Sequence, residues 1–374
     1  MVDPETWIEN GFVEVANGRV VSVGRADMKP GAMDHGPGVI MPALGNAHTH
    51  LSLSSLKDRI DTKDGFIPWV RNLIRLRDVI PEAETESACT AAAATMKECG
   101  VGFAAEVGPL QSGTRAMDQN QIMGLVFLEC LGPGPDYPSL PDDRGDLFFS
   151  WAGHAPHTTS PEFLRAIKAG AHRMGKPFSI HLAESEAEVE FLTTGEGEWF
   201  QFMGSRGHDC SQWRPWGERP VKRAYRLGLL DSETIAVHLL EVEPDEIDIL
   251  ARTGTKVCVC PRSNLALHGK LPNIEAFLRR GLNPAIGTDS LASVPSLDIF
   301  DEMSFIAANY AGLRPETIIG LATTNVAHAL GLRELGSLKP GQLALMIYVD
   351  TEATTGREAA EKLVSVNELQ VKWL

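Results

Sequence analysis

Five side chains that can bind metal ions or carry protons stand at the ends of apolar runs in this 374-residue chain. His48 and His50 follow the run 39–44, and residues two positions apart in a strand point to the same face. His181, His238 and Asp289 lie near the ends of later apolar runs. Imidazoles and carboxylates are common ligands of divalent metal ions, so the sequence predicts a metal centre where the fold brings these residues together.

The elements that must position these residues are short strands that alternate with helices. Helical stretches separate the apolar runs throughout residues 45–331, which indicates βα units and a parallel sheet. The candidate strands are 45–50, 101–107, 121–131, 147–155, 177–183, 234–239, 256–260 and 284–289. Eight such strands predict a (β/α)8 TIM barrel, for which roughly 250 residues are typical. Functional side chains gather at the carboxyl ends of barrel strands, which is where the five residues lie.

Both ends of the chain have the character of short β-structure. Asn17-Gly18 separates the alternating runs 12–15 and 19–24, which is a strong hairpin signal. The segments 343–349 and 369–374 have similar strand character. We therefore expect a composite β-domain from residues 1–44 and 332–374, and a catalytic barrel from residues 45–331.

The stretch 186–230 is long for one barrel crossover. It is rich in glycine and in aromatic residues, among them Trp199, Phe202, Trp213 and Trp216. This composition is typical of a loop that folds over a pocket, and equally of a surface insertion with its own small core. Both alternatives stay open at this point.

Composition and charge narrow the class of protein. A net charge of −15 argues against a nucleic-acid surface and suits a small-molecule substrate. No apolar run approaches the roughly 18 to 20 residues of a membrane span, and the first residues lack a secretion signal. The six cysteines show no disulfide spacing, so we expect reduced thiols and a cytoplasmic protein. Cys258 and Cys260 fit a buried strand better than a metal pair. Whether the chain forms a homodimer stays open.

The residue types predict hydrolytic chemistry. Three imidazoles and one carboxylate leave a position for water, whose pKa a bound metal ion lowers from about 15.7 toward about 7. Glu184, three residues after His181, could protonate a ring nitrogen and relay the proton to a leaving group. Asp289 could accept a proton of the water, and His238 could bind the metal ion or orient the water.

Three further residues have two interpretations each. His154, near the end of the strand 147–155, is either a substrate contact or a structural residue. His268 follows the seventh strand and could line the pocket. Glu106, at the end of the second strand, is either a buried partner of the site or bonded to the barrel wall.

Six segments of the chain together resemble the amidohydrolase superfamily, in the branch of cytosine, guanine and adenosine-type aminohydrolases and the related chlorohydrolases. In order they are 46–51, 154–156, 181–184, 237–238, 260–265 and 287–293. The resemblance implies deamination or hydrolytic displacement on a nitrogen heterocycle, with one divalent metal ion, zinc before iron or manganese. It implies His48, His50, His181 and Asp289 as metal ligands, and Glu184, His238 and Asp289 as catalytic residues. The terminal strands resemble the composite β-sandwich of this family.

Within this branch, residues 65–77 resemble the aminodeoxyfutalosine deaminases, and so do residues 220–223 and the compact length. This resemblance implies a purine nucleoside analogue as substrate. The predicted substrate contacts are Trp69, Arg71, His154, Arg262, Asn264 and Ser290. Alternatives are deamination of S-adenosylhomocysteine, methylthioadenosine, guanine or cytosine, and hydrolysis of a C–Cl or N-alkyl bond on a triazine. A non-catalytic ligand-binding relative is a third alternative.

The sequence departs from the family pattern at three places. Relatives usually have a β-strand before the segment matched by residues 7–11, so we expect this chain to lack a first strand. Glu241 stands where many relatives have a second histidine. Residues 341–345 lack an Ala-Asp-Leu motif that is frequent in relatives.

Overall fold

A computed structural model describes residues 1–25, 27, 29, 31–134, 139–210, 213, 217–365 and 369–374. Its centre is a sheet of eight parallel strands that follow one another in chain order. They are β4 (Leu44–Thr49), β5 (Val101–Gly108), β6 (Met123–Cys130), β7 (Leu147–Gly153), β8 (Phe178–Leu182), β9 (Thr234–His238), β10 (Lys256–Val259) and β11 (Ala285–Ile286). A parallel bridge between Thr49 and Asp289 joins the first and last strands. The predicted (β/α)8 TIM barrel is therefore confirmed.

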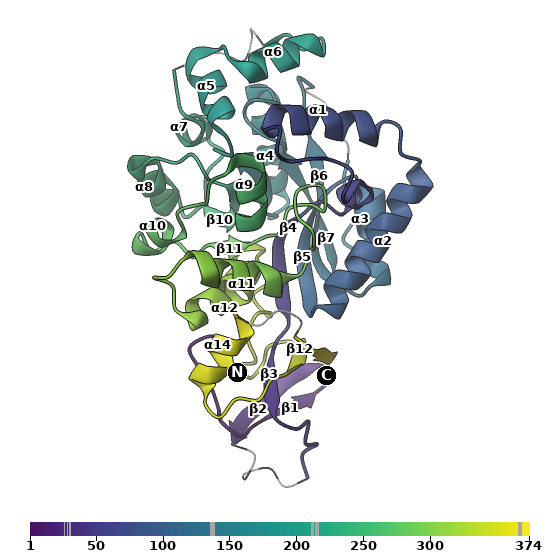
Figure 1. Ribbon diagram of the computed structural model, residues 1–374, viewed down its shortest axis with the longest axis vertical. Coiled ribbons are helices and arrows are strands. Elements are labelled where there is room, and N and C mark those ends of the chain that lie inside the picture. The colour runs from purple at the N-terminus through teal and green to yellow at the C-terminus, as the bar shows by residue number, and fades with distance from the viewer. Residues whose placement is uncertain are drawn as a thin grey trace.

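Helices follow the strands, and most of them lie around the outside of the barrel (Figure 1). They are η2 (Leu51–Leu56), α1 (Phe66–Arg77), α2 (Glu82–Glu98), α3 (Leu110–Gln119), α4 (Pro161–Arg173), α5 (Glu186–Thr194), α6 (Glu198–Ser205), α7 (Pro220–Arg226), α8 (Pro244–Thr253), α9 (Pro261–His268), α10 (Ile274–Arg279), α11 (Ile299–Asn309), α12 (Pro315–Ala322), α13 (Thr324–Ala329) and α14 (Gly356–Leu363). Capping residues explain where some of these helices begin and end. Ser160 accepts a hydrogen bond from the Phe163 amide at the start of α4, and Gly254 ends α8 with a φ of 71°.

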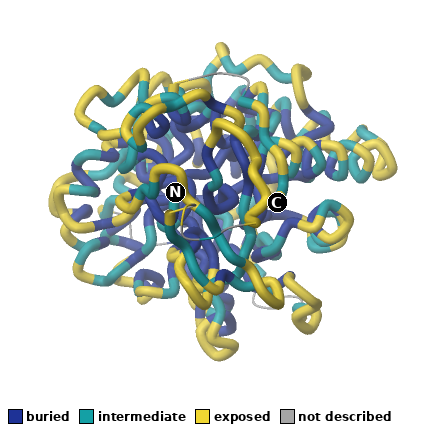
Figure 2. Tube along the Cα trace, turned by 90° about the horizontal axis from the view of Figure 1, so that it is seen from below, coloured by how far each residue is buried: buried dark blue, intermediate teal, exposed yellow. Residues whose placement is uncertain are grey.

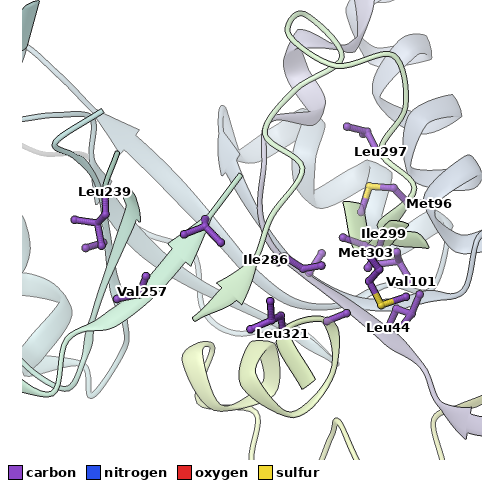
Figure 3. Packing of buried hydrophobic residues seen from close by; sticks show 14 of the residues in the cluster. Leu44, Met96, Val101, Leu239, Val257, Ile286, Leu297, Ile299, Met303 and Leu321 are labelled. Carbon is purple, nitrogen blue, oxygen red and sulfur yellow. The ribbon is translucent and has the colours of Figure 1, made fainter. Parts of the chain in front are cut away.

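Alternate residues of the strands point into the barrel and out toward the helices, as strand geometry requires. Leu125 and Phe127 of β6 pack inside the barrel, whereas Val126 between them packs in the outer layer. Figure 3 shows part of this outer layer, in which Leu321 of α12 lies near Ile286 of β11. The strand-end cysteines Cys258 and Cys260 are free and belong to the interior cluster.

Two small antiparallel sheets lie at the end of the barrel away from α1 and α6 (Figure 1). One is the predicted hairpin of β1 (Gly11–Ala16) and β2 (Arg19–Arg25), with φ of 53° at Asn17 and 71° at Gly18. The other pairs β3 (Gly38–Pro42) with β12 (Met346–Asp350), and β12 with β13 (Val371–Trp373). Strands from both ends of the chain therefore share one sheet, and Figure 2 shows both termini on this side of the molecule. The division into residues 1–44 plus 332–374 and residues 45–331 stays a prediction.

The excursion over 186–230 combines the two expected features. Trp199, Phe202 and Met203 pack with Phe191 and Trp213 in a small cluster that also includes Ile67 of α1. Three residues of the same helix α6, Trp199, Phe202 and Met203, also line a cavity at the carboxyl end of the barrel. Trp216 lies outside the described residues.

The eighth predicted strand, 284–289, is longer than β11, which covers two residues. The chain continues along β4 through backbone hydrogen bonds, with the amides of Thr288 and Asp289 both donating to the carbonyl of His48. A φ of 63° at Asp289 then turns the chain out of the sheet. No described helix has the length and apolar character needed to cross a membrane. The cytoplasmic location stays a prediction.

Candidate active site

Three imidazoles meet at the carboxyl end of the barrel. His48 lies on β4, His50 directly follows it, and His181 lies on β8. One ring nitrogen of each lies within 4.8 Å of those of the other two, and the Nε2 atoms of His48 and His181 are 3.2 Å apart. All three residues are buried. The barrel therefore brings together residues that are more than 130 positions apart in the chain.

Asp289 joins this group from the segment after β11, which pairs with β4 and so closes the barrel. The amide of His50 donates to the Asp289 carbonyl at 3.2 Å, which fixes the two residues side by side. The Asp289 Oδ1 atom lies 3.8 Å from His50 Nε2. The Ser263 hydroxyl donates to the other oxygen, Oδ2, at 2.6 Å. One carboxylate oxygen is thus held in place, and the other faces the imidazoles.

The protonation of the imidazoles suits metal binding. His50 Nδ1–H donates to the Val107 carbonyl at 2.8 Å, so its Nε2 atom carries the free lone pair. Burial and, secondarily, the neighbouring histidines hold the pKa of His48 and of His181 well below the usual range. Both are therefore neutral at pH 7, which is the form that ligates metal ions. Together with Asp289, this donor set fits a divalent ion that prefers nitrogen and oxygen ligands.

Glu184 lies beside this group, between two other histidines. Its Oε1 atom is 3.7 Å from His238 Nε2 and 3.3 Å from His268 Nε2. Burial alone would raise the pKa of Glu184, but the electrostatic interaction with His238 and the hydrogen bond with His268 lower it to about 2. Glu184 is therefore a carboxylate at neutral pH. Asn264 Nδ2 donates to His238 Nδ1 at 3.3 Å, which leaves the proton of His238 on Nε2, facing Glu184.

The backbone turns sharply where these residues leave their strands. The φ angles are 52° at Ala183, 75° at His238 and 63° at Asp289, all in the left-handed region. Each such conformation costs a non-glycine residue of order 1–3 kcal/mol, and it persists only where the surroundings hold it. Two amides in this region, Ala183 N at 3.2 Å and Glu184 N at 2.8 Å, donate to the buried Glu188 carboxylate. Glu188 thereby fixes the turn that presents Glu184.

A cavity of about 510 Å³ opens above these groups. Its floor consists of His50, His181, Glu184, His238 and Asp289. Helices α1 and α6, which lie together at this end of the barrel, supply walls (Figure 1). Phe66 and Trp69 of α1 stack with ring centroids 5.8 Å apart and planes 15° apart. Large aromatic faces above a polar floor are typical of a site for a planar ring.

The structure places two of the six predicted substrate contacts on the cavity wall. Trp69 lines it while its Nε1–H donates to the Ala292 carbonyl at 3.0 Å. His154 lines it with Nδ1 hydrogen-bonded to the Thr158 hydroxyl at 2.6 Å. The other four, Arg71, Arg262, Asn264 and Ser290, do not line the cavity.

Local geometry explains each difference. Arg71 is exposed, because two residues after Trp69 a helix has turned by about 200°, whereas Arg77 does line the cavity. The Arg262 guanidinium turns to α11 and donates to Glu302 and to the Ser296 carbonyl, both at 2.8 Å. Asn264 and Ser290 are fully buried, and Asn264 contacts the site through its hydrogen bond to His238.

Glu129 is a cavity residue that the sequence reasoning missed. It lies near the end of β6, and its Oε1 atom is 4.0 Å from His181 Nδ1. Glu129, like His181, lies near the carboxyl end of a barrel strand, where functional side chains gather. Its position in the sequence could therefore have identified it. Glu106, in contrast, is fully buried and accepts a hydrogen bond from the Leu51 amide at 2.8 Å, directly after His50.

Comparison with known proteins agrees with this arrangement. The model of the amidohydrolase family matches residues 39–371. A 5-methylthioadenosine/S-adenosylhomocysteine deaminase of Symbiobacterium thermophilum is 30% identical, over 92% of this chain and 81% of the relative. An aminodeoxyfutalosine deaminase of Deinococcus radiodurans is 31% identical, over 86% of this chain and 82% of the relative.

A solved structure shares the fold. The aminofutalosine deaminase of Helicobacter pylori, in complex with methylthio-coformycin, superposes with a TM-score of 0.85 at 21% identity. The match covers 97% of this chain and 93% of that chain. The chain therefore belongs to the amidohydrolase family and is a hydrolase that acts on carbon–nitrogen bonds.

Proposed function

We propose that this protein is a metal-dependent hydrolytic deaminase of an adenine nucleoside analogue, with aminodeoxyfutalosine as the first candidate. The observation that carries the proposal is the position of Glu184. Its carboxylate lies in the same cavity as His181 and Asp289 and 3.7 Å from His238, so a proton carrier stands beside the metal-ligand group. Two relatives at about 30% identity are named as deaminases of adenosine analogues, which supports the same substrate class.

In this proposal His48, His50, His181 and Asp289 hold one divalent ion, with zinc the first candidate because three imidazoles and a carboxylate suit it. When bound, the ion supplies Lewis-acid activation of water near neutral pH. Ser263 orients Asp289 by its hydrogen bond to Oδ2. Val107 orients His50 by accepting from Nδ1–H.

Glu184 acts in this proposal first as a base and then as an acid. With a pKa of about 2 it is a carboxylate at neutral pH, so it must take a proton from the attacking water before it can give one away. It transfers that proton to the ring nitrogen next to the amino-bearing carbon. The carbon thereby becomes more electrophilic as the water oxygen adds to it.

Asp289 and His238 complete the proton transfers. Asp289 Oδ1 accepts the second proton of the water and delivers it to the amino group, which leaves as ammonia. His238 donates from Nε2, the nitrogen that Asn264 leaves protonated, and so orients the oxygen during addition. At the end one proton of the water is on the ring nitrogen, the other has left with ammonia, and both carboxylates are regenerated.

The cavity suits a substituted nucleoside better than a free base. A volume of about 510 Å³ exceeds the need of a single heterocycle, and the stacked Phe66–Trp69 pair provides a flat apolar wall. The Trp69 Nε1–H is already bonded to Ala292, so this ring contributes its face and not a hydrogen bond.

The proposal is tested by measuring ammonia release from the metal-loaded protein with a panel of substrates. The panel contains aminodeoxyfutalosine, adenosine, methylthioadenosine, S-adenosylhomocysteine, guanine, cytosine and a chlorotriazine, with chloride measured for the last. We expect ammonia from the substituted adenosines and kcat/KM highest for one of them. Release of chloride only, or turnover of guanine or cytosine alone, would contradict the nucleoside assignment.

A further inference from the structure

Glu129 has a buried carboxylate oxygen, Oε1, that lacks a hydrogen bond within the described part of the chain. The residue is the last but one of β6. It faces the inside of the barrel, because Leu125 and Phe127, four and two residues earlier on the same strand, pack there. A buried carboxylate oxygen without a donor costs free energy, so its surroundings should supply a partner.

A ring nitrogen of His181 lies close to this oxygen. The distance from His181 Nδ1 to Glu129 Oε1 is 4.0 Å, and Nδ1 has no hydrogen bond to any described residue. Backbone hydrogen bonds fix this approach, since the His154 amide donates to the Cys130 carbonyl at 2.9 Å and the His181 amide to the His154 carbonyl at 3.0 Å. The two unbonded atoms are therefore separated by a gap about 1 Å longer than a hydrogen bond.

The proposed ligand set determines which nitrogen of His181 carries the proton. His181 Nε2 lies 3.2 Å from His48 Nε2, so Nε2 is the nitrogen that binds the ion. A neutral imidazole that binds through Nε2 keeps its proton on Nδ1, and histidine ligands usually donate this N–H to a carboxylate, a carbonyl or water. His50 shows the arrangement with a carbonyl, because its Nδ1–H donates to Val107 at 2.8 Å. For His181, the Glu129 carboxylate stands in the corresponding place.

Glu129, His154 and His181 also form a potential ligand group for a second ion. His181 opposes this alternative, since a protonated Nδ1 has no lone pair for another ion once Nε2 binds the first. His154 is already engaged through Nδ1 with the Thr158 hydroxyl at 2.6 Å. The Glu129 oxygen is therefore better suited to accept a hydrogen bond than to bind a second ion.

We propose that Glu129 is a positioning residue of the metal centre, whose carboxylate accepts a hydrogen bond from His181 Nδ1–H when Nε2 binds the ion. The Glu129 side chain lines the cavity and is 19% exposed, so its carboxylate has room to move toward the ring. This hydrogen bond fixes the plane of the ring and makes Nε2 a stronger ligand. The inference rests on the proposed function only through metal binding by His181, and it requires no particular substrate.

The test measures zinc affinity in the absence of substrate. The purified protein is equilibrated with zinc buffers set by nitrilotriacetate, and bound zinc is determined by elemental analysis. Glu129→Leu removes the charge and the acceptor and should raise the Kd for zinc roughly 100-fold, whereas Glu129→Gln keeps an acceptor oxygen and should raise it about 10-fold. A role in filling space alone would not give this order, because both replacements are close to glutamate in size.

Glu82→Gln is the matched control, because Glu82 also lines the cavity but lies exposed in the first turn of α2. It removes the same charge and should change the Kd by less than about twofold, since solvent screens an exposed charge. An unchanged Kd in both Glu129 variants would overturn the inference, and a raised KM in the same variants would assign Glu129 to the substrate instead.

Two zinc ions per wild-type chain, one of them lost in Glu129→Gln, would also overturn the inference, because Glu129 would then be a ligand. His48→Ala separates this failure from failure of the proposed function. If zinc binding persists in His48→Ala, the proposed metal centre is wrong, and the role of Glu129 falls with it. If zinc is lost in His48→Ala but held with wild-type affinity in both Glu129 variants, the role of Glu129 alone is refuted.

Discussion

His268 Nε2 lies 3.3 Å from Glu184 Oε1, although 84 residues separate the two in the chain. His268 is the last residue of α9, and its ring also packs on Phe66 of α1 with centroids 4.6 Å apart. The carboxylate proposed to move protons is therefore held from a helix that contributes no metal ligand. Through His268, the protonation state of Glu184 is therefore linked to the position of Phe66, which lines the cavity.

His268→Phe should raise the pKa of Glu184, because the hydrogen bond from His268 helps to hold that pKa at about 2. Glu184 would then take up its proton at a higher pH than in the wild-type protein. As the pH is lowered, kcat/KM should therefore begin to fall at a higher pH. His268→Gln keeps an N–H donor and should restore much of the wild-type profile. Leu265→Ala, on the exposed side of the same helix, is the control. Identical acid limbs in all four proteins would exclude a positioning role for His268.

Glu184→Gln should lower kcat by roughly 10²- to 10⁴-fold, the usual effect of losing an acid–base group. Metal content should not change, because Glu184 is not among the clustered ligands. Glu186→Gln is the control, since Glu186 is two residues away and exposed. Near-normal turnover in Glu184→Gln would remove this residue from the proposed mechanism.

His48→Ala should reduce bound metal from one ion per chain to a small fraction, measured by elemental analysis after dialysis. His172→Ala is a useful comparison, because His172, Asp231 and Glu233 also form a potential ligand group but lie toward the surface. That variant should keep the full metal content. Unchanged stoichiometry in His48→Ala, or a loss in His172→Ala, would place the metal ion elsewhere.

Arg262→Lys should lower the free energy of unfolding by about 2–5 kcal/mol in urea denaturation. The Arg262 side chain is 11% exposed and holds Glu302 and the segment around Ser296, and a lysine cannot reproduce its fork of donors. KM should change little, since Arg262 does not line the cavity. Arg71→Lys on the surface of α1 should affect neither quantity. A selective rise of KM in Arg262→Lys would instead support the substrate contact predicted from sequence.

Glu302→Gln should alter how stability depends on pH. Burial raises the pKa of Glu302 to about 7, in spite of the opposing effect of Arg262. The folded state binds the proton of Glu302 more tightly than the unfolded state does. The stabilisation that this proton gives the folded state is therefore fully present below about pH 4.5, and it is lost as the pH rises through 7. The wild-type protein should therefore lose up to about 3 kcal/mol relative to Glu302→Gln between pH 4.5 and 8. Parallel stability curves for the two proteins over this range would contradict the raised pKa.

The fold was predictable because buried parallel strands are apolar along their whole length and are separated by capped helices. Ser160, Gly254 and Asn17-Gly18 each end or begin an element where their chemistry predicts. The roles of the strand-end residues His48, His181 and Asp289 could also be predicted from the sequence, because a barrel places the carboxyl ends of all its strands on one face.

What the sequence did not reveal depends on side-chain direction. Arg262 belongs to a segment that borders the site, yet its side chain extends away from the cavity to Glu302. The pairing of His268 with Glu184 and of His157 with Trp199 joins elements that only the folded chain brings together. Spacing within one segment carries no information about contacts of this kind.

The hydrogen-bonded pairing of β4 with the segment at Asp289 has a consequence for when the proposed metal site is completed during synthesis. His50 is made early and Asp289 some 240 residues later, yet backbone hydrogen bonds must join them before the fourth proposed ligand is in place. A nascent chain that has not yet released residue 289 from the ribosome therefore offers only part of the ligand set. With the proposed ligand set, full metal affinity would be acquired only after nearly all of the barrel has emerged, so metal loading would report that the ring of strands has closed.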